Sequence, residues 1–192
     1  NSRMLAISLQ FSPKFDKEIS SAFVDKIETA SLLHDIGMLS VNDAVAYKNT
    51  NLTADELEGI RRHTVVGADY LQKINTDKNK NGYLEMAVEI AKYHHENWDG
   101  TGYPEGLSGT DIPLSARIVA VIDTFMALNS ERSYRDAYTR EESVEIIKSE
   151  AGRRSSGVCD RWKRKRNSGV PETAAPGNSF CNGSSPYQRR RL

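Results

Sequence analysis

The chain has 192 residues, of which 38% are hydrophobic and 27% charged, and its 26 basic side chains balance its 26 acidic ones. This length suits about one domain with a buried core. No run approaches the roughly 18 apolar residues of a membrane span, no secretory leader is evident at the start, and two cysteines are too few for a disulfide scaffold. We therefore expect a soluble, cytoplasmic protein.

Apolar residues recur at helical spacing through residues 1–151, and no segment there alternates polar and apolar residues over a strand length. Four stripes stand out: Phe23–Ile27–Ala30–His34, Leu57–Ile60–His63–Gly67, Ala87–Ile90–His94 and Ala116–Val119–Asp123–Ala127. The spacing predicts an all-α fold, a bundle of about five to seven helices.

Local signals mark where these helices begin. Thr53 with Glu56, and Thr139 with Glu142, have the spacing of a capping box, in which each side chain accepts a hydrogen bond from the other residue's backbone N–H. Pro113 suits a first helical turn, where its missing N–H would have no partner. The segment 97–113 contains four glycines and two prolines, so we expect a long structured loop there.

The stripes contain polar residues where a core-facing position favours leucine or isoleucine. His34, His63, His94 and Asp123 occupy such positions, and Asp35 and His95 follow two of them directly. A single histidine on an apolar face is more often a hydrogen-bonded core residue. All four histidines of the chain belong to this set, however, and a buried carboxylate is normally paired or bound to metal. Imidazole and carboxylate together suit a transition-metal site, and consecutive ligands suit a cluster of two ions.

Longer motifs then make the pattern specific. HDIG spans residues 34–37, HHENWDGTGYP spans residues 94–104, and IPLSARI spans residues 112–118. With Asp123 and the segment 130–135, this strongly resembles the HD-GYP family, a branch of the HD-domain metal-dependent phosphohydrolases that hydrolyses cyclic di-GMP in bacterial second-messenger signalling, often within response regulators. The resemblance covers roughly residues 1–151.

This resemblance implies an HD-domain helical bundle and a cyclic di-GMP phosphodiesterase. It assigns six metal ligands, His34, Asp35, His63, His94, His95 and Asp123, which hold two divalent transition-metal ions, most commonly Fe or Mn. Asp35 typically bridges the ions, and Asp35 and His34 are the implied catalytic residues.

The resemblance also implies substrate contacts and partners. Arg132 and Arg135 would hold the substrate phosphates, a contact that suits an arginine fork, although ordinary surface charges are the alternative. Gly102 and Tyr103 would shape the substrate side of the site. The loop Gly102-Tyr103-Pro104 would contact proteins of the diguanylate cyclase type, and an upstream sensory domain would be fused to the phosphohydrolase.

The chain departs from the family pattern at several positions. Met38 and Met126 stand where the family has Lys and Asp, and the family's upstream histidine ligand would lie just before Asn1. We therefore expect the domain to be truncated at its N-terminus and its activity to be impaired. A catalytically weak or inactive signalling module that binds nucleotide or a partner protein is the alternative. HHENWDGTGYP argues against a different HD-superfamily chemistry, such as that of a nucleotidase or a di-iron oxygenase.

The resemblance stops at residue 151. Residues 1–151 carry 16 basic and 24 acidic side chains, whereas residues 152–192 carry 10 and 2, with both cysteines. A segment so poor in apolar residues cannot offset its chain entropy. We therefore expect a domain over 1–151, cut short at its C-terminus, and a basic, Ser/Gly/Pro-rich, disordered tail over 152–192. A foreign reading frame, a solvated charge run and a nucleic-acid-binding segment remain alternatives for the tail.

Overall fold

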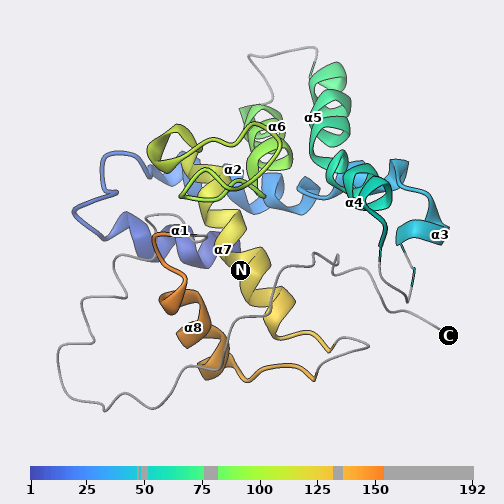
Figure 1. Ribbon diagram of the computed structural model, residues 1–192. Coiled ribbons are helices and arrows are strands. Elements are labelled where there is room, and N and C mark those ends of the chain that lie inside the picture. The colour runs from blue at the N-terminus through green and yellow to red at the C-terminus, as the bar shows by residue number, and fades with distance from the viewer. Residues whose placement is uncertain (47, 49–51, 76–81, 132–135, 154–192) are drawn as a thin grey trace, which may run out of the picture.

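A computed structural model of the chain describes residues 1–46, 48, 52–75, 82–131 and 136–153 (Figure 1). Its α-helices are α1 (Ser2–Gln10), α2 (Ser21–Ala30), α3 (Asp43–Ala46), α4 (Ala54–Arg61), α5 (His63–Ile74), α6 (Gly82–Tyr93), α7 (Leu114–Leu128) and α8 (Arg140–Ser149). Three short 3-10 segments are η1 (Ser31–Leu33), η2 (Ile36–Ser40) and η3 (Gly109–Asp111).

The all-α prediction is confirmed. Within the described ranges there is no β-strand, and Asp99 and Ser108 form an isolated antiparallel bridge. Seven of the described α-helices have eight or more residues, and α3 is a single turn of four. None of these helices is long and apolar enough to cross a bilayer.

Both predicted capping boxes are present. The Thr53 hydroxyl accepts from the Glu56 N–H at 3.2 Å, and the Thr53 N–H donates to the Glu56 carboxylate at 2.7 Å. The matching distances between Thr139 and Glu142 are 3.2 and 2.8 Å. These bonds satisfy N–H groups that an uncapped first turn leaves free.

Three of the predicted stripes run past the end of a helix, and the shortest departure is at His94, one residue beyond α6. The stripe that ends on His34 leaves α2 at Ala30 and passes through η1. The stripe from Leu57 to Gly67 is shared by α4 and α5, which meet at Arg62. In the latter two cases the helix ends before the polar residue, so that residue lies at a bend of the chain.

Helix α6 forms the centre of the fold and packs against α2, α5 and α7 (Figure 1). It buries Leu84, Met86, Ala87, Ile90 and Ala91. The core cluster is completed by buried residues of α1, α2, α5, α7 and the segment between α1 and α2, namely Ala6, Leu9, Phe15, Ile19, Val24, Ile27, Ala30, Leu71, Ile118 and Val119. Burial of this apolar surface is the main stabilising contribution.

A close backbone approach joins η2 to α5. A Cβ atom on Gly37 would lie 1.9 Å from the His63 carbonyl oxygen and 2.7 Å from the Gly67 nitrogen. Only glycine leaves room for this contact. The contact sets Asp35, just before η2, beside the first residue of α5.

The proposed tail falls almost wholly outside the described residues, which end at residue 153. The domain boundary at residue 151 and the disorder of residues 152–192 therefore stay predictions.

Candidate metal centre

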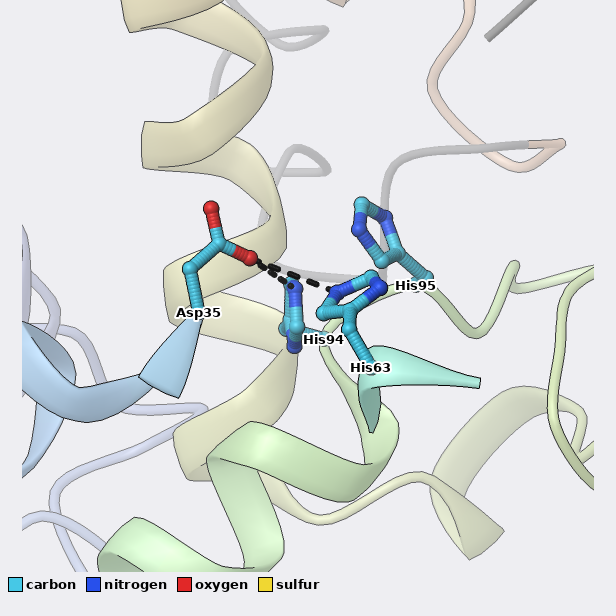
Figure 2. Close-up of side chains that lie close together, drawn as sticks. All are labelled: Asp35, His63, His94 and His95. Carbon is cyan, nitrogen blue, oxygen red and sulfur yellow. Dashed lines mark ion pairs between the residues drawn. The ribbon is translucent and has the colours of Figure 1, made fainter. Parts of the chain in front are cut away.

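Four side chains from three segments converge at one place. Asp35, His63, His94 and His95 each offer a ligand atom, and these atoms all lie within 4.8 Å of one another (Figure 2). Asp35 lies between η1 and η2, His63 begins α5, and His94 and His95 directly follow α6. The convergence thus depends on the packing of η2, α5 and α6.

Asp35 is the centre of this group. Its Oδ1 lies 3.3 Å from the His63 Nε2 and 3.5 Å from the His94 Nε2, and its Oδ2 lies 3.4 Å from the His34 Nε2. The His63 and His94 side chains are 3% and 0% exposed, and that of Asp35 is 8% exposed. The carboxylate is therefore surrounded by imidazole nitrogens in a nearly dry environment.

The backbone fixes the orientation of three of these rings. The Nδ1 of His34 lies 2.9 Å from the Ser31 carbonyl, that of His63 2.7 Å from the Ile60 carbonyl, and that of His94 2.9 Å from the Ile90 carbonyl. A carbonyl oxygen only accepts, so each Nδ1 carries the proton and donates. In a neutral ring the Nε2 then has the free lone pair, and it is this atom that points toward Asp35.

This arrangement fits a divalent metal ion. The Nε2 atoms of His63 and His94 are buried and have no hydrogen-bond partner. With the Nδ1–H groups engaged, lone pairs face a carboxylate, and a cation between them removes the repulsion. A ligating histidine whose other ring nitrogen donates to a carbonyl is typical of metal sites. His34, Asp35, His63, His94 and His95 offer imidazole and carboxylate donors that suit transition metals.

The electrostatics of the cluster agree with this fit. Burial acts to raise the pKa of Asp35, but hydrogen bonds from the His63 and His94 rings and the positive charge of His34 and His94, when these rings carry a proton toward the carboxylate, hold the pKa of that carboxyl well below its usual range. Positive charge at this place, whether from a proton or from a cation, thus stabilises the ionised form of Asp35. Burial, with the charges of His94 and His63, holds the pKa of His95 well below its usual value. The site thus favours an ionised carboxylate beside a neutral His95, the forms that bind metal.

The loop after His95 closes one side of the site. The Tyr103 ring stacks on the His95 ring with centroids 4.9 Å apart, and the Tyr103 N–H donates to the His95 carbonyl at 3.3 Å. A Cβ on Gly102 would lie 2.3 Å from the Asn97 nitrogen and 2.5 Å from the Glu96 Cα. The absence of a side chain at residue 102 therefore lets the loop lie directly against the backbone that carries the histidines.

Glu96 is a site-supporting residue that the sequence reasoning missed. It is 3% exposed, and its Oε1 accepts from the backbone N–H groups of Glu105 at 2.7 Å and Gly106 at 3.1 Å. The carboxylate therefore ties the far end of the loop to the histidine pair. Its position beside His95 was visible in the motif, but its inward orientation depends on how the loop folds back.

The remaining predicted site residues lie in different places. His34 borders the cluster, with its ring centroid 5.2 Å from that of His94. Asp123 lies on α7, outside the group of four, and its charge acts on the Tyr103 hydroxyl, whose pKa is raised chiefly by burial. Arg132 and Arg135 fall outside the described residues. The metal and substrate roles of all these residues stay predictions.

Comparisons with known proteins agree with this geometry. The family model described as an HD domain matches residues 1–156. A 3'3'-cGAMP-specific phosphodiesterase of Vibrio cholerae is 38% identical over 70% of the chain and 25% of its own length. A cyclic di-GMP phosphodiesterase of Thermotoga maritima is 40% identical over 70% of the chain and 35% of its own length. The chain thus spans only about a quarter to a third of these relatives.

A third relative and one solved structure extend the comparison. A cyclic di-GMP phosphodiesterase response regulator of Xanthomonas campestris is 40% identical over 73% of the chain and 36% of its own length. A crystal structure of a cyclic GMP-AMP specific phosphodiesterase of V. cholerae matches with a TM-score of 0.53 at 19% identity, over 86% of this chain and 44% of that one. At that identity the structural match shows a shared fold alone.

Proposed function

Since this chain belongs to the HD domain family, of the HD-GYP type, we propose that it is a metal-dependent phosphodiesterase that hydrolyses cyclic di-GMP in bacterial second-messenger signalling. The reaction adds one water across a phosphorus–oxygen bond and opens the cyclic dinucleotide. The observation that carries the proposal is the pair of buried Nε2 atoms that have no hydrogen-bond partner and face the Asp35 carboxylate. The names of the relatives supply the substrate class.

We further propose that the centre holds two divalent ions, Fe or Mn, through His34, Asp35, His63, His94, His95 and Asp123. When bound, such ions activate water and neutralise charge that develops on the phosphate. Four of these residues already form the compact cluster, and His34 borders it. Asp35 would supply negative charge that offsets the repulsion between two cations, and the Nδ1 hydrogen bonds hold the His34, His63 and His94 rings in a fixed orientation.

Substrate contacts and partners complete the proposal. Tyr103 and Gly102 border the centre on the loop side, which supports their role at the substrate. Arg132 and Arg135 remain the candidates for the phosphates. The same loop, ending at Pro104, is the candidate contact for diguanylate cyclase-type proteins, and an upstream sensory domain would regulate the activity in the cytoplasm.

Hydrolysis measured together with metal content tests this function. The full chain, purified without oxygen and supplied with Fe(II) or Mn(II), is expected to bind about two ions and to convert cyclic di-GMP to a linear dinucleotide or GMP. Chromatography of the products and elemental analysis of the protein provide the measurements. Nucleotide binding without turnover, in a metal-loaded chain, would instead establish the signalling-module alternative. Less than one metal ion per chain would overturn the two-ion centre.

A further inference from the structure

A groove adjoins the metal centre where α4 meets α5. It has a volume of about 180 Å³ and is lined by Glu58, Arg61, Arg62, Val65, Tyr103 and Pro104. Pockets that hold a drug-sized ligand measure about 300–1,000 Å³. The groove is therefore large enough for one ring system of a ligand and too small for a whole dinucleotide.

Tyr103 connects this groove to the metal centre. The Tyr103 ring lines the groove and stacks on the His95 ring. The Arg61 guanidinium lies over the same ring, with its Cζ 5.3 Å from the ring centroid. A group in the groove would thus be separated from the metal-ligand cluster by the Tyr103 ring. That spacing suits a nucleoside whose neighbouring phosphate is at the metals.

The charged side chains of the groove offer two kinds of hydrogen bond. Arg61 and Arg62 present guanidinium donors, and Glu58, whose Oε2 lies 3.9 Å from the Arg61 Nη1, presents carboxylate acceptors. Donors and acceptors therefore stand side by side along one edge of the groove. Arginine pairs with the O6 and N7 of guanine, and carboxylates accept from amino groups of bases.

We propose that this groove is a guanine-binding subsite, in which Glu58 accepts from the N1–H and 2-amino groups while Arg61 or Arg62 donates to O6 and N7. The inference rests on the proposed function, because it assigns a base of the cyclic dinucleotide to a place beside the centre. On the guanine ring, O6 lies between N1–H and N7. A carboxylate next to a guanidinium matches that order of groups.

The same chemistry disfavours two other occupants. Adenine has a lone pair at N1 and no 2-amino group, so Glu58 would face an acceptor where guanine offers donors. A phosphate would pair with the arginines but would be repelled by Glu58. Glu58 is therefore the residue that separates guanine from both, and it acts as a specificity-determining residue.

Binding of GMP, AMP and inorganic phosphate to the full chain tests this subsite. GMP and AMP share the ribose and the phosphate, so the ratio of their dissociation constants, measured by calorimetry with Mn(II) present, reports on the base alone. GMP is expected to bind about tenfold or more tightly than AMP. Glu58→Ala and Arg61→Lys should each bring the ratio toward one. Asp55→Asn removes a charge from the same helix at a residue that does not line the groove, and it should leave the ratio unchanged.

The outcomes separate this inference from the proposed function. Equal binding of GMP and AMP by the unaltered chain, or a ratio that neither groove variant changes, would overturn the subsite even if the chain hydrolyses cyclic di-GMP. A Glu58→Ala chain that binds phosphate more tightly, with GMP and AMP changing together, would identify an anion site and would also overturn it. A base preference that depends on Glu58, in a chain without hydrolysis, would support the subsite and refute the phosphodiesterase.

Discussion

The inner and outer halves of the site differ in burial and in how their residues are held. Asp35, His63 and His94 form the inner half, with side chains 8%, 3% and 0% exposed. In the outer half, Arg61 and Glu58 are 45% and 67% exposed. A dry environment strengthens electrostatic interactions, so the inner half suits a cation. The outer half is wet, and it suits selection among ligands by hydrogen bonds.

The largest expected effect comes from the inner half. Asp35→Asn keeps the shape of the side chain but removes the negative charge that faces three Nε2 atoms. Metal affinity should fall by more than the roughly 10–100-fold that the loss of an outer partner costs, and hydrolysis should become undetectable. Metal titration and product analysis measure the two effects. Asp69→Asn, an exposed change on α5, serves as the control, and wild-type metal binding in Asp35→Asn would refute the proposed role.

A smaller effect is expected where the two halves meet. Gly102→Ala places a Cβ 2.3 Å from the Asn97 nitrogen, so the loop must shift and Tyr103 must move on His95. Overpacking of this kind destabilises by about 1–3 kcal/mol. The melting temperature and the rate of hydrolysis should both fall.

Gly59→Ala is the matched control for Gly102→Ala. A Cβ at residue 59, on α4, meets nothing within 4 Å, and alanine is favoured over glycine in a helix by up to about 1 kcal/mol. This variant should melt at a higher temperature than the parent. If both alanine variants melted alike, the close packing of the loop would not be the cause.

The smallest effect concerns pH. Burial and the charges of His94 and His63 lower the pKa of His95 in the folded chain, while the unfolded chain regains a value near 6.5. Below about pH 6.5 the unfolded state therefore binds the extra proton, and stability falls as pH falls. The slope from one group is at most about 1.4 kcal/mol per pH unit.

Melting of the metal-free chain between pH 7.5 and 5.5 checks this dependence. His95→Gln should show a weaker fall in melting temperature over the same range, because it lacks the titrating group. The low pKa of Asp35 makes stability depend on pH only at much lower pH, below the ordinary aspartate value of about 3.9. An identical pH dependence in parent and variant would contradict the assignment to His95.

The sequence predicted the inner half better than the outer half, for a physical reason. A histidine or aspartate in an apolar stripe is out of place at a core position, so His34, His63 and His94 were recognisable from spacing alone. Glu58, Arg61 and Arg62 look like ordinary charges on the wet face of an amphipathic helix. Only the folding of the loop, which brings Tyr103 against Arg61, makes a groove of them.

Helix boundaries near the site were harder to predict than the helices themselves. The capping boxes at Thr53 and Thr139 marked two starts correctly. No glycine or proline in the sequence indicates the junction of α4 and α5 at Arg62. The backbone of Arg62 stays close to helical, with φ −61° and ψ −14°. Tertiary packing, including the contact of Gly37 with the His63 carbonyl, is what locates this bend.

The hydrogen bonds from the Nδ1 atoms connect each ring only to a carbonyl three or four positions earlier in the chain. The ring nitrogen that carries the proton is thus set by the local backbone of each histidine and does not depend on residues distant in the sequence. Folding then only has to bring together three rings whose orientation is already fixed by these local hydrogen bonds. An arriving ion therefore finds little to rearrange, and its binding is expected to be fast and limited by access.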